Sequence, residues 1–209
     1  MDLINTVDRT SDKGRGRFNW ASIPDKGVVT FGEYGIEKQS EEIVPFHNLL
    51  PERNSRGKKV SAVVRVFKLT GPEGEREVRQ VSFPDWPDMK PLPFEVLNEL
   101  LNLVKTQKAC CPGQRLSVNC LAGLGRTGTF LGVEEVSRQV EINELTTENL
   151  EFQVIQILMQ GKLSCQHTDF VQTSGQNRCF QEAARRYVTL SQQSVESCPS
   201  ETDRQGKDH

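Results

Sequence analysis

The first half of the chain is rich in alternating and β-branched apolar residues, whereas apolar residues in the second half recur at helical spacing. Short strands are predicted at Val28–Phe31 and 43–46, and Pro45 places the second of these toward a sheet edge. A longer strand is predicted at 60–69 because small and β-branched residues alternate there. Its predicted buried face is formed by Val60, Ala62, Val64 and Val66.

The glycines and proline at 71–74 predict a turn, so residues 77–83 are expected to return as the second arm of a hairpin. A helix is predicted from Pro93 to about Lys108, with a core-facing stripe of Leu97, Leu100, Leu101 and Val104. The other predicted elements are a strand end at 1–7, polar loops at 8–17 and 48–59, a strand at 116–120, and helices at 126–140, from Thr146 or Thr147 to about Gly161, and at 176–190.

The segment from Val118 to Phe130 combines a cysteine, a glycine-rich turn and the start of a helix. Such a turn can direct several backbone N–H groups at one anion, and a helix N-terminus adds unpaired donors and positive potential. Arg126 adds a planar set of donors that suits two phosphate oxygens. The same positive surroundings favour the thiolate of Cys120, so the sequence predicts a nucleophile seated in an anion site.

The spacing from Cys120 to Arg126 is not specific by itself, since Cys179 with Arg185 and Cys198 with Arg204 share it. The glycines and the predicted strand–loop–helix context distinguish the first pair. With them, the segment resembles the signature loop of the protein tyrosine phosphatases, His-Cys-Ser-Ala-Gly-x-Gly-Arg-[Ser/Thr]-Gly. The resemblance implies that Cys120 is the nucleophile and that phosphate is held by Leu121, Ala122, Gly123, Leu124, Gly125 and Arg126. Asn119 replaces the usual histidine, and Leu121 replaces the serine.

Three more segments resemble parts of the same family. Trp86-Pro87-Asp88 is similar to its movable acid loop, which implies that Asp88 protonates the leaving oxygen; Asp85 is the alternative acid. Lys90 stands where the family usually has glycine, so loop closure is expected to differ. Thr127 follows the arginine, where a family hydroxyl assists breakdown of the thiophosphate intermediate. Asp12-Lys13-Gly14 resembles the Glu-Lys-Gly loop of the family.

Residues 171–180 resemble the Gln-Thr-x-x-Gln-x-x-Phe segment of the family. The match implies that Gln172 orients the hydrolytic water and that Gln176 supports it. Without the other motifs, the same residues would be interpreted as a surface turn and a helix N-cap.

Composition and charge narrow the function classes. A chain of 209 residues fits one domain, predicted at 1–190 and followed by a disordered tail at 191–209. The net charge of −2 argues against nucleic acid as the main partner, and no apolar run is long enough for membrane insertion. The six irregularly spaced cysteines favour reduced thiols and a cytoplasmic location. No metal-ligand spacing is present, and a thiol–phosphate reaction needs no cofactor.

The resemblance covers about residues 7–190 and implies an α/β fold, with a twisted mixed central sheet flanked by helices, that lacks the N-terminal part of the family domain. It implies a tyrosine phosphatase that hydrolyses phosphotyrosine in proteins through a cysteinyl-phosphate intermediate. One alternative is a weakened or inactive pseudophosphatase that only binds phosphotyrosine, which Asn119 and Lys90 favour. The other is a dual-specificity phosphatase, since losing the loop that sets pocket depth would admit phosphoserine.

Overall fold

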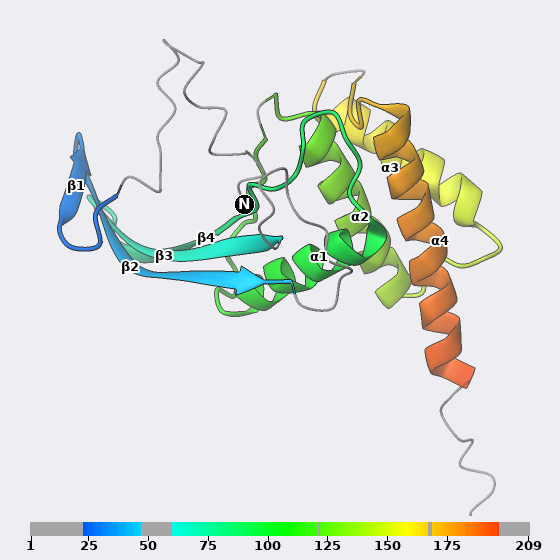
Figure 1. Cartoon of the computed structure of the whole chain (residues 1–209), viewed down its shortest axis with the longest axis horizontal. Helices are drawn as coiled ribbons and strands as arrows, with labels where there is room; N and C mark the ends of the chain where they lie inside the picture. The colour runs from blue at the N-terminus through cyan, green and yellow to red at the C-terminus, as the bar shows by residue number, and fades with distance from the viewer. Residues whose placement is uncertain (1–22, 47–59, 121, 167–168, 197–209) are drawn as a thin grey trace, which may run out of the picture.

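The computed structural model describes residues 23–46, 60–120, 122–166 and 169–196 (Figure 1). The elements follow one another as β1 (Val28–Phe31), β2 (Tyr34–Pro45), β3 (Ser61–Gly71), β4 (Gly74–Ser82), α1 (Phe94–Ala109), α2 (Gly125–Glu141), α3 (Leu150–Ser164) and α4 (Ser174–Glu196). The expectations for residues 1–7, 8–17 and 48–59, for Asp12-Lys13-Gly14 and for Leu121 lie outside the described residues.

The four strands form one antiparallel sheet in the order β1-β2-β3-β4. The predicted hairpin of β3 and β4 is confirmed, with Gly71 paired to Gly74. β2 starts at Tyr34, well before the predicted strand at 43–46. Its central part is charged and gives no apolar alternation, so backbone pairing to β1 and β3 makes it a strand. Gly32, with a φ of +58°, supplies the left-handed residue of the short turn between β1 and β2.

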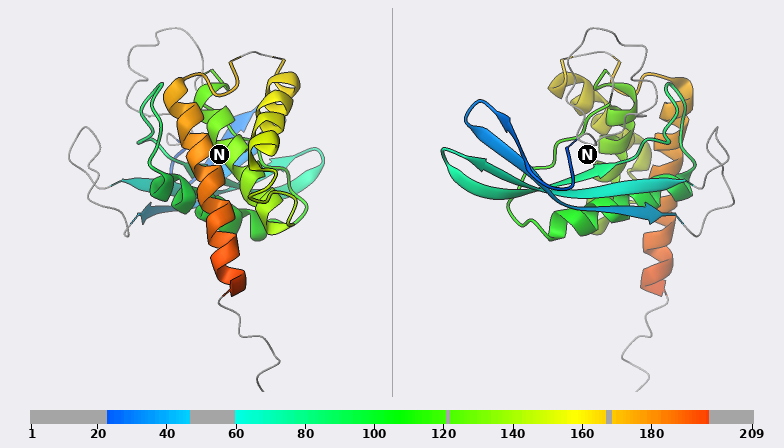
Figure 2. Two further views of the ribbon diagram at one scale, coloured as in Figure 1. Left: turned by 90° about the vertical axis from the view of Figure 1, so that its right-hand side faces the viewer. Right: turned by 60° about the vertical axis from the view of Figure 1, so that its left-hand side comes forward.

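The buried side of β3 changes along the strand. Ala62 and Val64 belong to the main core, as predicted, but Val66 is only half-buried and Phe67 is buried instead. Phe67 forms a second, smaller cluster with Ile23 and Ile36. A register shift in β2 between Lys38 and Ser40 lies opposite this change, as expected where a bulge bends and twists a sheet. Figures 1 and 2 show that the end of the sheet that carries β1 curves away from the helices.

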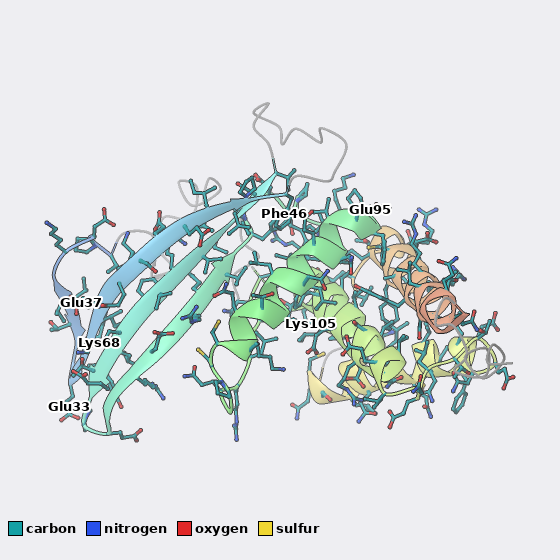
Figure 3. All side chains as sticks on the ribbon, turned by 90° about the horizontal axis from the view of Figure 1, so that it is seen from below. Glu33, Glu37, Phe46, Lys68, Glu95 and Lys105 are labelled. Atoms are coloured by element: carbon teal, nitrogen blue, oxygen red, sulfur yellow. The ribbon has the colours of Figure 1, made fainter. Side chains whose placement is uncertain are left out.

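The helices pack beside the other half of the sheet and supply most of the main core. In Figure 3 α1 runs alongside the strands, and its predicted stripe of Leu97, Leu100, Leu101 and Val104 is buried. α2 contacts α1, α3 and α4 and is therefore the central helix of this group. Because its face toward α4 carries Gly132, the ring of Phe180 packs directly on its backbone.

Two helix boundaries differ from the prediction. α3 continues past Gly161 to Ser164, and its N-cap is Asn149 rather than Thr146 or Thr147. The missing side chain at Gly161 makes room for the buried ring of Phe170, so this glycine serves packing and does not end the helix. α4 extends beyond the predicted end at 190, so part of the predicted tail is helical.

The predicted strand at 116–120 does not join the sheet. Only Asn119 forms an isolated bridge, and the neighbouring residues are irregular. The described sheet is therefore antiparallel throughout rather than mixed, while the expected α/β class with flanking helices is confirmed. Among the described residues, no helix is long and apolar enough to cross a membrane.

We predict that Gly161→Ala destabilises the protein by about 1–3 kcal/mol, the usual cost of overpacking a core. A Cβ at this position would overlap the Phe170 ring, and this outweighs the helix preference for alanine. Urea unfolding measures the change. Combining Gly161→Ala with Phe170→Leu should cost less than the sum of the two single changes. An additive or stabilising result would contradict the packing role.

Candidate active site

The candidate site lies where the segment after Asn119 turns into α2. Gly123 adopts a left-handed φ of +75°, and the first α2 residue, Gly125, is buried. The N–H of Gly128 donates to the Leu124 carbonyl at 2.7 Å, which closes the first helical turn. The earlier N–H groups of this turn have no partner within the helix, so the end of α2 next to Cys120 carries positive potential.

Cys120 is 8% exposed, and the pKa of its thiol is below the ordinary value for cysteine. Burial opposes this by raising the pKa, but the nearby Thr127 hydroxyl and the Thr127 and Gly123 amides favour the thiolate and lower it. The Arg126 charge lowers it further. The Thr127 hydroxyl oxygen is buried and makes no hydrogen bond to the described residues, so its proton is available to the thiolate.

Arg126 joins the cysteine loop to the loop that follows β4. Its side chain is only 5% exposed. Nη1 donates to the Trp86 carbonyl at 3.1 Å, and Nη2 lies 3.1 Å from Oδ1 of Asp88. A buried guanidinium needs such partners because an unpaired charge in the interior is costly. The structure therefore brings Asp88 to the Cys120 loop. The neighbouring contact joins Trp86 to Arg126, which are 40 residues apart in the sequence.

The loop that carries Asp88 is anchored at its base and exposed at its tip. Trp86 is fully buried, and its Nε1 donates to the Lys90 carbonyl at 2.9 Å. Asp88 is 59% exposed despite its contact with Arg126. Met89 adopts a left-handed φ of +58°, so the strained residue of this turn is Met89 and not Lys90, the position where the family usually has glycine.

The two glutamines of the 171–180 segment pack against the start of α2. A Cβ on Gly125 would lie 2.5 Å from Oε1 of Gln172 and 3.0 Å from Oε1 of Gln176. Glycine at this position thus lets both amides approach the loop backbone. Gln176 is almost fully buried, and its Nε2 has no hydrogen-bond partner among the described residues.

Gln176 also caps α4, so the two interpretations of this segment hold together. The Thr173 N–H donates to Oε1 of Gln176 at 3.2 Å, and the Gln176 N–H donates to the Thr173 hydroxyl at 3.1 Å. This reciprocal pair is a capping box, which fixes the glutamine relative to the helix start.

Thr173 is a residue of the site that sequence reasoning missed. Its hydroxyl donates to the Met89 carbonyl at 3.3 Å and so links the start of α4 to the loop of Asp88. The signal that could have found it is the Thr-x-x-Gln spacing of the capping box, which marks Thr173 as the N-cap.

The predicted site residues of the described chain therefore converge, although they come from three separate segments. Cys120, Arg126 and Thr127 lie at the start of α2, Asp88 reaches Arg126, and both glutamines reach Gly125. Ala122, Gly123 and Leu124 form the turn between Cys120 and the helix. This set offers an acidified thiol, a guanidinium, free amide donors and a carboxyl group around one small volume.

Comparison with known proteins gives several curated relatives. Tyrosine-protein phosphatase non-receptor type ptp-2 of Caenorhabditis elegans is 33% identical over 103 residues, which is 44% of this chain and 15% of that protein. Human receptor-type tyrosine-protein phosphatase alpha is 27% identical over 113 residues, which is 53% of this chain and 13% of that protein. Human protein tyrosine phosphatase type IVA 3 is 38% identical over 75 residues, 35% of this chain and 43% of that protein. The chain thus matches only a small part of the first two relatives.

Solved structures show the same fold. The catalytic domain of human protein tyrosine phosphatase non-receptor type 18 superposes with a TM-score of 0.60 at 22% identity, covering 84% of this chain and 56% of that one. The family profile described as protein-tyrosine phosphatase matches residues 21–184, most of the chain. This match shows that the chain, with its Cys120 loop and its Asp88 loop, belongs to the protein-tyrosine phosphatase family.

Proposed function

We propose that this protein is a protein tyrosine phosphatase that hydrolyses phosphotyrosine in protein substrates. The observation that carries the proposal is the acidified Cys120 thiol beside Arg126, which also holds the Asp88 carboxylate. Membership of the family supports it. The human type 18 enzyme, similar in fold, has been solved with HER2 phosphopeptides, which is consistent with a peptide-borne substrate here.

The first chemical step is attack of the Cys120 thiolate on phosphorus. A sulfur–phosphorus bond forms while the bond from phosphorus to the phenolic oxygen of tyrosine breaks, and its electron pair stays on that oxygen. Arg126 and the amides at the start of α2 stabilise the charge that spreads over the other three phosphate oxygens. Because the pKa of Cys120 is lowered, a larger share of this residue is thiolate than for an ordinary cysteine, so the proposed reaction uses no separate base to activate the nucleophile.

Asp88 supplies the proton that the leaving oxygen needs. Its carboxylate lies on Arg126, a position where a phosphate oxygen would compete with it. A bound phosphate dianion repels a second negative charge, so binding favours the protonated form of Asp88. The proton then passes to the phenolic oxygen, and tyrosine leaves in its neutral form.

In the second step, water attacks phosphorus and the sulfur–phosphorus bond breaks, which returns the thiolate and inorganic phosphate. The Asp88 carboxylate accepts the proton that water loses. Gln172 and Gln176 are assigned to hold this water, because both amides lie against Gly125 and Gln176 Nε2 has an unused hydrogen-bond donor. Thr127 is assigned to assist departure of the thiolate, since its hydroxyl serves the sulfur.

A thiolate nucleophile requires a reducing environment. The five cysteines of the described residues are free thiols, although Cys110 and Cys111 are adjacent. We therefore place the protein in the cytoplasm, where it would act on phosphotyrosine in signalling proteins.

The first test of the function is Cys120→Ser, assayed with a phosphotyrosine peptide. The serine hydroxyl has no base to activate it, so turnover should be lost while the peptide still binds through Arg126 and the loop amides. Cys165→Ser, a change at an exposed cysteine, is the matched control and should retain full activity. Activity of the Cys120 variant above about a tenth of wild type would refute the assigned nucleophile.

The same assay on the wild-type protein separates the two alternative functions. An inactive wild-type protein that binds the peptide would indicate a pseudophosphatase, and comparable turnover of phosphoserine would indicate dual specificity.

A second prediction compares Asp88→Asn with Asp85→Asn. Removing the true acid should lower kcat by roughly 10²–10⁴ and erase the basic limb of the pH–rate profile. The loss should shrink for aryl phosphates with acidic phenols, because their leaving oxygen needs less protonation. We expect these effects for Asp88 only, since its carboxylate reaches Arg126. If the Asp85 variant shows them and the Asp88 variant does not, the acid is misassigned.

A third prediction concerns Thr127 and the pH dependence of the thiol. Because the pKa of Cys120 is lowered, its reactivity toward iodoacetamide should persist below the pH at which ordinary cysteines lose it. Thr127→Val removes one hydroxyl that favours the thiolate, so the midpoint of alkylation should move to higher pH. Thr127→Ser keeps the hydroxyl and should keep the midpoint. Mass spectrometry of the Cys120 peptide separates this signal from the exposed cysteines, and an unchanged midpoint in the valine variant would contradict the role.

A further inference from the structure

The outward face of α3 carries a row of large apolar side chains. Phe152, Ile155, Met159 and Leu163 are 62%, 55%, 58% and 76% exposed. They follow one another at intervals of three and four residues, so they form one continuous stripe along the helix. We call these four residues the α3 stripe. Single exposed apolar residues are common, but a continuous stripe of four on one helix marks a contact surface.

The α3 stripe is presented by a firmly packed helix. Val154 and Ile157 on the opposite face are buried in the main core. The Phe170 ring packs on Gly161 and Gly128, which ties α3 to α2. In Figure 2 α3 lies at the edge of the helical group, and its contacts are with α2 and α4. The stripe is therefore a preformed surface whose ordering costs little on binding.

The sequence of this face is self-complementary. If a second copy of α3 lies antiparallel against the first, with the two-fold axis near residue 157, Phe152 faces Leu163 of the other copy and Ile155 faces Met159. An isologous contact of this kind requires one patch to match itself in reverse order. The α3 stripe meets this requirement, and we propose that two copies of this chain associate through antiparallel contact of their α3 helices.

The charges beside the α3 stripe fit the same arrangement. Glu151 and Lys162 are exposed and lie on one flank, since eleven residues bring a helix back to within about 20° of the same direction. In an antiparallel two-fold pair, each flank meets the same flank of the other copy. Glu151 of each copy therefore faces Lys162 of the other, which gives two ion pairs. A parallel pair would bring opposite flanks together and lose both ion pairs.

The other flank is uncharged and matches in the same way. Gln156 and Gln160 are exposed there, and the same two-fold axis sets one opposite the other, so their amides can exchange hydrogen bonds. No charge is buried without a partner in this arrangement.

The contact is small. A single helix of about 22 Å buries less than the roughly 800 Å² per partner of a standard interface, so the dimer should dissociate at micromolar concentrations.

Sedimentation velocity over roughly two decades of micromolar concentration tests the proposal on the full chain. The wild-type protein should shift from monomer to dimer as its concentration rises. Met159→Glu places two like charges near the two-fold axis and should weaken dimerisation at least tenfold. Leu190→Glu is the matched control, a similar change at an exposed apolar residue of α4, and should leave the dimer intact. A wild-type protein that stays monomeric, or a dimer unaffected by Met159→Glu, would overturn the proposal.

Charge reversal tests the antiparallel register. Glu151→Lys and Lys162→Glu should each weaken the homodimer, because each creates two like-charge contacts. A mixture of the two single variants should form heterodimers more tightly than either forms homodimers, since both ion pairs are then restored. The double variant should regain the homodimer. Failure of the mixture and of the double variant to recover association would exclude the proposed register. Because none of these residues belongs to the candidate active site, phosphatase activity provides an independent check of folding.

Discussion

The buried guanidinium of Arg126 is the group on which the site depends. A charge that is 5% exposed is stable only with polar partners, and it finds them in the Trp86 carbonyl and the Asp88 carboxylate. These partners come from a different part of the chain, so satisfying the arginine also draws the acid loop onto the start of α2. The same charge helps to lower the pKa of Cys120. One residue thus links the positions of Cys120 and Asp88, the proposed nucleophile and acid.

The acid loop combines a fixed base with an exposed tip. Trp86 is fully buried in the main core and bonded to the Lys90 carbonyl, whereas Asp88 at the tip is mostly exposed. Between Asp88 and Lys90, the Met89 carbonyl accepts a hydrogen bond from the hydroxyl of Thr173, which lies at the start of α4. These are few and individually weak hydrogen bonds, so the tip can exchange its contact with Arg126 for a ligand while the base stays in place. Exchange of the Arg126 contact for a ligand would therefore need movement of only the few residues around Asp88.

The sequence predicted those elements whose signal is local. The α1 stripe, the β3–β4 turn and the start of α2 follow from apolar spacing and glycines within short windows, and all three are confirmed. β2 was largely missed because its charged centre is a strand only through pairing with its neighbours. The segment at 116–120 shows the converse, since its apolar pattern yields only an isolated bridge at Asn119 and no strand of the described sheet.

For the site as for the fold, local features could be predicted from the sequence, whereas contacts between distant segments could not. The anion-binding character of the Cys120 loop follows from residue types alone, whereas the approach of Asp88 to Arg126 rested on a family resemblance, because the two are distant in sequence. Burial of Cys120, which opposes its own acidity, could not be read from the sequence. Nor could the contact of both glutamines with Gly125, since it depends on where α4 begins in space.

The replacement of the usual histidine by Asn119 can be judged from the same geometry. The groups that lower the pKa of Cys120 are Thr127, Gly123 and Arg126, all of which follow the cysteine in the chain. They are fixed by the first turn of α2 and by the left-handed Gly123, whose positions are set by packing against Gln172, Gln176 and the buried core. A neutral amide at 119 removes none of them. The lowering of the Cys120 pKa therefore comes from the helix start that follows the cysteine, and no charged residue at position 119 contributes to it.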